Sequence, residues 1–177
     1  MPRLQSLGAL ALLVACGTSA GPAEGDQVEG LLTVRWTGSY EGSFTAPATG
    51  RWCQTDSLVE ILAARADTGI GLVLLGQDSV RAGQYPVFPS RVFIPSRPQA
   101  HAVVRWLGKS QVLGFEGKGG QLTLTEAGER LTGRVEASLR LFPAGATDTV
   151  RMVGEFTRIP VTTATPPCGR LLKPAAG

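Results

Sequence analysis

The sequence predicts an all-β domain, either an antiparallel β-sandwich or a small closed β-barrel of about 8–10 strands. Apolar and polar residues alternate with a period of two in several segments, and turn signals separate these segments at regular intervals. Glycine is frequent, with 23 residues, whereas aromatic residues make up only 6% of the chain. Glycines inside strands are compatible with the tight curvature of either architecture.

The earliest predicted strand places Leu32, Val34 and Trp36 on one face. We expect a break at Gly38-Ser39, after which the strand continues through Tyr40, Gly42 and Phe44. The same alternation recurs at residues 102–106 and 122–125.

Residues 57–69 fit two structures. Ser57 and Glu60 have the spacing of a capping box, and residues 61–66 have good helix propensity. Alternatively, residues 58–65 and 70–75 form a hairpin around a turn at Asp67-Thr-Gly69. We favour the hairpin because it keeps the surrounding β pattern continuous.

The clearest alternation, at residues 130–141, is followed by a facing strand at residues 150–156. If the two form a hairpin, the residue numbers of every facing pair have the same sum. This sum must be odd, because the inward residues have odd numbers in the first strand and even numbers in the second. A sum of 291 would oppose Arg140 to Arg151, whereas a sum of 289 opposes Arg134 to Glu155. Opposed like charges destabilise a sheet, so we predict 289.

Glycine and proline clusters mark the predicted turns. They lie at residues 47–50, 67–69, 117–120, 126–129 and 143–145.

Composition excludes several classes of protein. With 177 residues, 43% of them hydrophobic, the chain is long enough for one domain with a real core and too apolar to be disordered. The net charge of +3 is too small for a nucleic-acid partner. Three cysteines and one histidine leave little material for a metal site. We therefore expect no metal, no cofactor and no catalytic residues.

Residues 1–15 have the features of a secretion signal. Arg3 precedes an apolar stretch from Leu7 to Ala15, which as a helix would cover about 14 Å and is too short to span a membrane. The stretch ends in Leu13-Val14-Ala15-Cys16, which resembles the lipobox of bacterial lipoproteins. The alternative is an ordinary signal peptide with an incidental cysteine.

In the lipoprotein family the cysteine thiol receives a diacylglycerol, a signal peptidase cuts before the cysteine, and the new amine is acylated. The resemblance implies cleavage between Ala15 and Cys16, lipidation of Cys16 and anchorage in the cell envelope. Gly17, in place of an Asp after the cysteine, favours the outer membrane of a Gram-negative bacterium.

These features predict four segments. A signal peptide (1–15) is followed by the lipidated Cys16 and a flexible tether (16–29), a single all-β domain (30–170) and a C-terminal tail (171–177). The small, polar residues 17–29 have a root-mean-square reach of about 20 Å.

Once Cys16 is assigned to the lipid, Cys53 and Cys168 remain in an oxidising compartment. We predict that they form one disulfide, which stabilises the fold by at most about 4–5 kcal/mol because it closes a long loop. Two separate buried thiols or a redox pair are the alternatives, although a redox pair usually has Cys-x-x-Cys spacing.

Two motif matches lack the context that their chemistry needs. Gly17-Thr-Ser-Ala-Gly21 fits the nucleophile elbow of hydrolases, but it lies in the tether, without the required strand and helix. Gly108-Lys-Ser110 resembles the end of a phosphate-binding loop, but Val103 stands where that loop needs glycine. We interpret Gly108-Lys-Ser110 as a turn between strands.

His101 is the only histidine, so a Ser or Cys triad would have to use it, with Glu116 or Asp148 brought close by the fold. Local spacing does not support such a triad, and we expect a histidine at a strand end or on the surface. The carboxylates are scattered, and a glycosidase would need two of them about 5–10 Å apart in a cleft.

The most distinctive segment is the proline-rich stretch at residues 85–98. Its four prolines exclude an interior strand. We consider it a candidate binding loop that presents aromatic and arginine side chains to a protein or glycan partner: Tyr85, Phe88, Arg91, Phe93 and Arg97. The alternative is a connection whose apolar residues cap the core.

Taken together, these features predict a membrane-anchored envelope lipoprotein that is a non-catalytic structural or binding module. The body of the chain resembles secreted β domains of bacterial lipoproteins, a likeness that implies no activity. One alternative is a barrel that carries a small apolar ligand in a cavity of about 300 Å³ or more, lined by residues such as Trp36, Tyr40, Phe44 and Trp106. An envelope glycan hydrolase is the other alternative.

The predicted disulfide can be tested by mass. When the mature protein is alkylated without reductant, Cys53 and Cys168 should take up no label, and reduction should make both reactive. Uptake of label by both cysteines before reduction would show that the bridge is absent.

Overall fold

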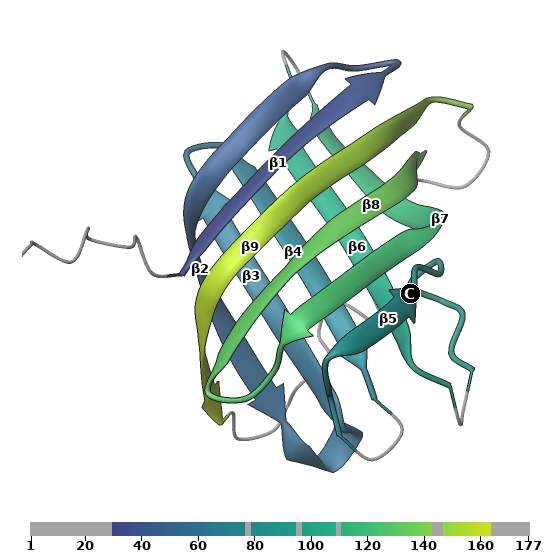
Figure 1. Cartoon of the computed structure of the whole chain (residues 1–177). Helices are drawn as coiled ribbons and strands as arrows, with labels where there is room; N and C mark the ends of the chain where they lie inside the picture. Colours follow the sequence, from purple (N-terminus) through teal and green to yellow (C-terminus); the bar gives the residue numbers. More distant parts are fainter. Residues whose placement is uncertain (1–29, 77–78, 95–96, 109–110, 143–146, 164–177) are drawn as a thin grey trace, which may run out of the picture.

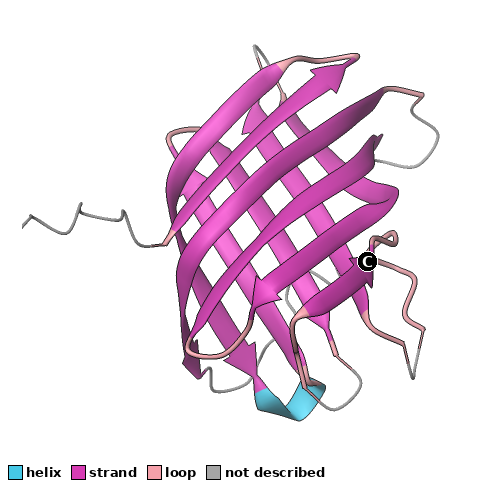
Figure 2. Cartoon of the chain, viewed as in Figure 1, coloured by secondary structure: helices cyan, strands magenta, loops and turns pink. Residues whose placement is uncertain are grey.

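The chain folds into a closed, eight-stranded antiparallel β-barrel with one additional short strand (Figure 1). This computed structural model describes residues 30–76, 79–94, 97–108, 111–142 and 147–163. The strands are β1 (Leu31–Gly38), β2 (Gly42–Cys53), β3 (Leu58–Arg65), β4 (Thr68–Leu75), β5 (Gly83–Pro86), β6 (Gln99–Leu107), β7 (Val112–Glu126), β8 (Arg130–Phe142) and β9 (Thr149–Thr163). A single turn of 3₁₀ helix, Gln54–Asp56, lies between β2 and β3 (Figure 2).

The wall of the barrel follows the chain order. The strands pair in the order β7-β6-β4-β3-β2-β1-β9-β8, and the pairing of β8 with β7 closes the ring. Because the first strand pairs with the last, both neighbours of β1 are satisfied, and the wall has no open edge there. The predicted all-β class is confirmed, in its barrel form.

Two strands change partners along their length. β7 pairs with β6 through residues 112–116 and with β5 through residues 121–124. The change follows a bulge between Gly117 and Gly119. Similarly, β2 and β9 pair directly with each other, in parallel, beyond the start of β1.

Two predictions about local structure are confirmed. Residues 58–75 form a hairpin in which Arg65 faces Thr68, and Ala66 in the turn has a φ of 52°. In the β8–β9 hairpin, Leu139 faces Val150 and Arg134 faces Glu155, which is the register with sum 289. The register changes by one residue between Leu131 and Gly133, opposite Arg158, whose φ is 50°.

Two predicted turns at glycines are wrong, and one predicted break is a turn between strands. The chain does not continue straight past Gly38-Ser39 but reverses there, so that Trp36 faces Gly42. Residues 47–50 lie inside β2, where Gly50 permits close contact with Val161 of β9. Residues 117–120 form the bulged part of β7, and Gly120 has a φ of 114°. Gly38-Ser39 thus breaks the strand as expected, but as a turn between β1 and β2. At Gly50 and Gly120, glycine serves a close approach or a bend in the wall rather than the expected turn.

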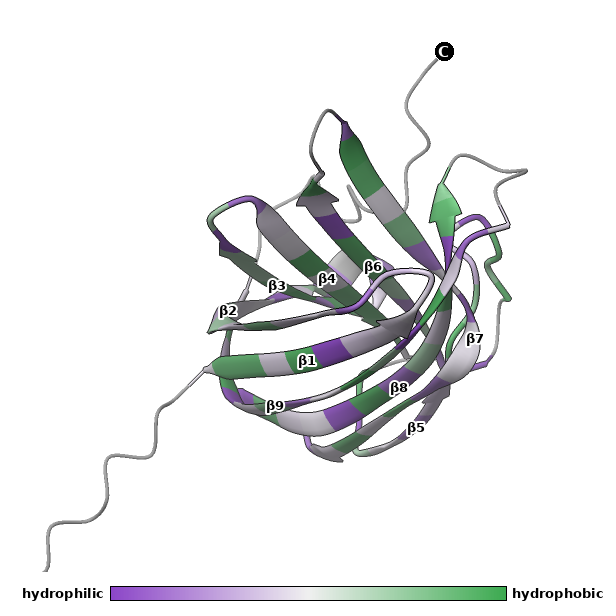
Figure 3. Cartoon of the chain, turned by 90° about the horizontal axis from the view of Figure 1, so that it is seen from above, coloured by the Kyte–Doolittle hydropathy of each residue, from purple (hydrophilic) through white to green (hydrophobic). Residues whose placement is uncertain are grey.

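The interior of the barrel is filled with apolar side chains. Inward and outward positions alternate along the strands, as the bands of hydropathy in Figure 3 show. Leu32, Leu72, Leu139, Met152 and Phe156 all have an exposed fraction of 0%. An exposed fraction of zero means that no water-sized space borders these side chains, so the middle of the barrel is a packed core.

Four aromatic rings, from the ends of β1 and β6, the start of β7 and the β1–β2 turn, pack together. The Trp106 ring stacks on Trp36 at 5.3 Å and on Phe115 at 4.9 Å between ring centres. Tyr40, from the β1–β2 turn, meets Trp106 and Phe115 edge-on. Three of the side chains proposed to line a ligand cavity, Trp36, Tyr40 and Trp106, thus belong to this aromatic stack.

Substitution of Gly42 tests this packing. A Cβ atom at Gly42 would lie 2.5 Å from Cζ2 and 2.6 Å from Cε2 of Trp36. We expect Gly42→Ala to lower the free energy of unfolding by about 1–3 kcal/mol, because the indole must move within a packed stack.

The measurement is urea unfolding, and Gly114→Ala is the matched control, since a Cβ there meets nothing within 4 Å. The control should change stability by less than about 0.5 kcal/mol. Equal effects of the two substitutions would contradict the packing argument.

Candidate functional site

Buried polar side chains lie on the outer face of the barrel, beneath the proline-rich loop. Glu116 of β7 faces Arg140 of β8 across the sheet, and Arg140 donates two hydrogen bonds to Oε1 of Glu116, at 2.9 and 3.2 Å. Ser90 of the loop donates to Oε2 of the same carboxylate at 2.9 Å. Both oxygens of Glu116 are therefore used, one by the wall and one by the loop.

Two side chains of β6 hold the same loop. His101 Nδ1 lies 2.9 Å from the carbonyl oxygen of Phe88, which can only accept, so Nδ1 carries the hydrogen. Gln99 accepts a hydrogen bond from the backbone N–H of Ile94 at 3.1 Å through Oε1. We call this set the loop latch, which comprises Ser90, Gln99, His101, Glu116 and Arg140.

The loop latch corrects the expectation for His101. Its side chain is only 3% exposed and sits within β6, because the loop covers a position that would otherwise face solvent. Burial lowers the pKa of His101 below its usual value; the hydrogen bonds to Phe88 and Pro89 and the charge of Glu116 act in the opposite direction.

The fold brings Ser90, His101 and Glu116 to one place, but not in the arrangement of a catalytic triad. A triad needs the imidazole between the carboxylate and the nucleophile. Here Ser90 donates directly to Glu116, and His101 donates to a backbone carbonyl. The second buried carboxylate, Glu60, lies on β3, which two strands separate from β7 in the sheet. The two buried carboxylates therefore do not converge.

Next to the loop latch, exposed apolar side chains gather in one area. Of the six large hydrophobic residues that are exposed in the described structure, five belong to the loop or to the neighbouring ends of β6, β7 and β8. We call these five the outer patch: Val92 (38% exposed), Phe93 (64%), Leu107 (56%), Val112 (60%) and Phe142 (50%).

Strand register places three members of the outer patch close together, and a cation–π contact brings the loop that carries the other two to them. Leu107 faces Val112 across the β6–β7 pair, and Phe142 faces Gly114, two residues further along β7. The guanidinium carbon of Arg91 lies 5.8 Å from the centre of the Phe142 ring, which joins the loop to β8.

The candidate binding loop is only partly as predicted. Arg91, Phe93 and Arg97 are exposed, whereas Phe88 is half-buried. The prediction that the loop presents Tyr85 to a partner is wrong. Tyr85 is buried in the core, because it lies on β5 opposite Leu122 and points inward. Its hydroxyl also bonds the backbone N–H and carbonyl of Arg81, at 2.9 and 2.7 Å.

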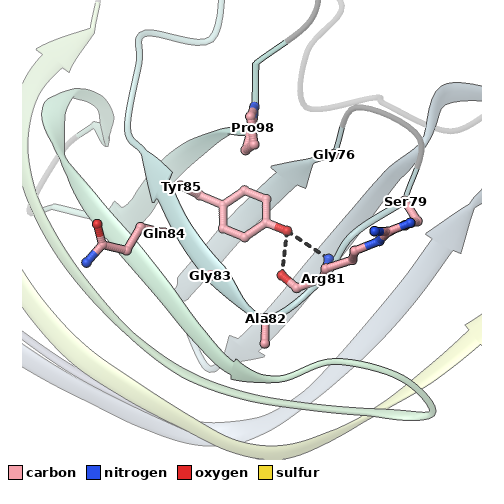
Figure 4. Close-up of a pocket in the computed structure, with 8 residues that line it drawn as sticks. All are labelled: Gly76, Ser79, Arg81, Ala82, Gly83, Gln84, Tyr85 and Pro98. Carbon is pink, nitrogen blue, oxygen red and sulfur yellow. Dashed lines mark hydrogen bonds between the residues drawn. The ribbon is translucent and has the colours of Figure 1, made fainter.

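A shallow pocket of about 250 Å³ lies beside β5 (Figure 4). Tyr85, Arg81 and Ser79 contribute to its wall, together with Gly76, Ala82, Gly83, Gln84 and Pro98. The polar groups at this wall bond one another: Arg81 Nε donates to Ser79 Oγ at 2.9 Å, and the Tyr85 hydroxyl is engaged by Arg81. The pocket thus offers few groups for a ligand.

Cys53 is buried at the end of β2 and is disulfide-bonded. The predicted partner, Cys168, and the predicted lipid site, Cys16, both lie outside the described residues. The identity of the bonded partner therefore stays a prediction.

Within the described ranges, no three His, Cys, Asp or Glu side chains form a group that could hold a metal ion. The same residues include no helix with the length and apolar character needed to cross a membrane. No protein-family model matches the chain, and no curated protein or solved structure is significantly similar to it. Functional inference therefore rests on the barrel and on its outer face.

Sequence reasoning missed most of this site. Phe142 had a signal, since it continues the outward-facing even positions of residues 130–140 with an apolar residue. The sequence contained no signal for the pairing of Glu116 with Arg140, because this pairing depends on how β7 and β8 align across a bulge.

The loop latch predicts a pH dependence of stability. Because the pKa of His101 is lower in the folded protein than in the unfolded chain, the unfolded chain binds more protons below about pH 6.5. Stability should therefore fall as the pH is lowered from about 6.5 through the folded pKa, and His101→Gln should remove this part of the dependence.

Urea unfolding at several pH values measures the effect, and NMR titration of the ring gives the pKa directly. His101 is the only histidine, so its signal needs no assignment. A folded-state pKa at or above the ordinary value would refute the prediction.

Proposed function

We propose that this chain is a lipid-anchored β-barrel of the bacterial envelope that acts as a non-catalytic binding module, with the outer patch as its binding surface. The outer patch carries this proposal. Monomeric proteins rarely gather exposed large apolar side chains in one place unless that place binds something. The loop latch supports it, because hydrogen bonds to the buried side chains of Glu116 and Gln99 hold the loop that carries Phe93 before a partner arrives.

The N-terminal sequence supports the envelope location. The lipobox at residues 13–16 implies that Cys16 carries the lipid and that the tether 16–29 joins it to the barrel. Two or more acyl chains anchor a protein stably, whereas one gives only marginal attachment. Gly17 favours the outer membrane.

The position of Cys53 supports its predicted bridge with Cys168. β9 ends at Thr163, which pairs with Trp52, the residue next to Cys53. Cys168 follows Thr163 by five residues, and five extended residues reach about 17 Å. We therefore propose that the Cys53–Cys168 disulfide closes the domain near residue 170, leaving 171–177 as a tail.

A carrier of a small apolar ligand is the second candidate. One observation favours it: the indole N–H of Trp36 is buried without a hydrogen-bond partner among the described residues, and a ligand could supply one. The packed interior argues against it, since the five side chains at its middle border no water-sized space. The pocket beside β5, at about 250 Å³, is also smaller than an ordinary ligand site.

The anchor is tested by Cys16→Ser in cells. We expect the unmodified protein to stay with membranes after a high-salt wash and to show the added mass of a diacylglycerol and an acyl chain. The variant should lose both the added mass and salt-resistant retention, because no acyl chain is attached. Retention of Cys16→Ser in salt-washed membranes would overturn the anchor.

Ser57→Ala serves as a control for the fractionation procedure, since Ser57 lies in the β2–β3 connection and the substitution leaves the lipobox intact. It should fractionate like the unmodified protein.

A further inference from the structure

We infer that the outer patch docks on an anionic phospholipid surface and gives the barrel a second, non-covalent attachment to the membrane. This inference rests on the proposed binding role of the outer patch and names its partner. Three observations carry it: the arrangement of the apolar side chains, the charge around them and the rigidity of their support.

The apolar side chains occupy successive rows across the barrel wall. Leu107 and Val112 face each other in the outermost row. The next row runs from Arg105 through Gly114 to Phe142, and the third holds Glu116 and Arg140 of the loop latch. A Cβ at Gly114 would meet nothing within 4 Å, so this position leaves open space between Arg105 and Phe142. Val92 and Phe93 directly follow Arg91 on the loop, and both are exposed.

Two exposed arginines lie within this area, and two acidic residues border it: the backbone carbonyls of Asp67 and Asp148 accept hydrogen bonds from the N–H groups of Leu107 and Leu141. Residues 79–115, which include the loop, β6 and the start of β7, contain five basic residues and no acidic one. Arg91 and Arg105 are exposed, one over the Phe142 ring and the other in the same row. The nearest carboxylate in the rows, Glu116, is already paired with Arg140. Exposed aromatic and aliphatic side chains among arginines are typical of proteins that bind the interface of anionic membranes.

The support of the patch is rigid. Leu107, Val112 and Phe142 sit on paired strands, and the loop latch fixes Ser90 and Ile94 on both sides of Phe93. Little conformational entropy is therefore lost when the patch meets a surface.

A second copy of the chain fits the patch less well than a membrane. In a symmetric dimer the same surface meets itself, which would bring Arg91 and Arg105 of the two copies close together. Like charges in such an interface oppose association, whereas anionic headgroups attract both arginines.

Vesicle co-sedimentation tests the inference. The protein used is the chain from residue 16 onward with Cys16→Ser, which retains every described strand and carries no lipid. Vesicles of phosphatidylcholine and phosphatidylglycerol in equal parts are compared with vesicles of phosphatidylcholine alone. We expect binding to the mixed vesicles, weakening with added salt, and little binding to the neutral ones.

Two pairs of variants separate the apolar and the charged contributions. Phe93→Ser with Phe142→Ser should weaken binding by at least about tenfold, because each phenylalanine loses its burial in the interface. Arg91→Gln with Arg105→Gln should weaken binding to the mixed vesicles and reduce its salt dependence.

Val153→Ser and Arg35→Gln are the matched controls. Val153 is also exposed and faces Arg35 across the β1–β9 pair. Across the β8–β9 pair it faces Glu136, which lies six residues along β8 from Phe142. Both controls should bind as the unmodified protein does. Circular dichroism and urea unfolding establish that each variant remains folded.

The inference is overturned if the protein binds the mixed vesicles no better than the neutral ones, or if the controls lose as much binding as the patch variants. It is also overturned if the protein forms a dimer that Phe93→Ser dissolves and does not bind vesicles. These outcomes leave the lipid anchor untouched, because salt-resistant retention and lipid mass report on Cys16 alone.

Discussion

The structure depends on the closure of one sheet. β1 pairs with β2 on one side and with β9 on the other, and β7 pairs with β8, so the main-chain groups of the wall find partners all the way round. Closure also determines what surrounds the interior. Eight strands leave a space that side chains can fill, and here Leu72, Met152, Phe156 and their neighbours fill it. With its interior occupied by its own core, the barrel can present recognition groups only at its ends and on its outer face.

The outer face is not uniformly polar. Along β6 and β7, Gln99, His101 and Glu116 occupy outward positions and yet are buried, because the proline-rich loop lies over them. Burying a carboxylate is costly unless its hydrogen bonds are satisfied, and Arg140 and Ser90 satisfy those of Glu116. The same bonds that stabilise the buried charge fix the loop. The stability of the buried charge and the position of the loop that carries Phe93 therefore depend on the same carboxylate, that of Glu116.

This link suggests how the proposed role works as a whole. A lipid at Cys16 would keep the barrel near the membrane, and the outer patch would set which side of the barrel faces it. Neither role requires a cavity, a metal or a reactive residue. The loop latch would then position the loop residues of the outer patch, and its buried His101 would make the attachment of the loop to the wall sensitive to acid.

Local patterns in the sequence determined a large part of this protein. Alternation with a period of two identified the strands, and the charges of Arg134 and Glu155 selected the β8–β9 register, because a one-residue shift would turn every side chain to the other face. Tertiary structure alone decided the rest. Whether Gly50 or Gly120 marks a turn or a close approach depends on which strand lies against it. The burial of His101 and Tyr85, and the contact of Arg91 with Phe142, arise from contacts between segments far apart in the chain, about which local periodicity carries no information.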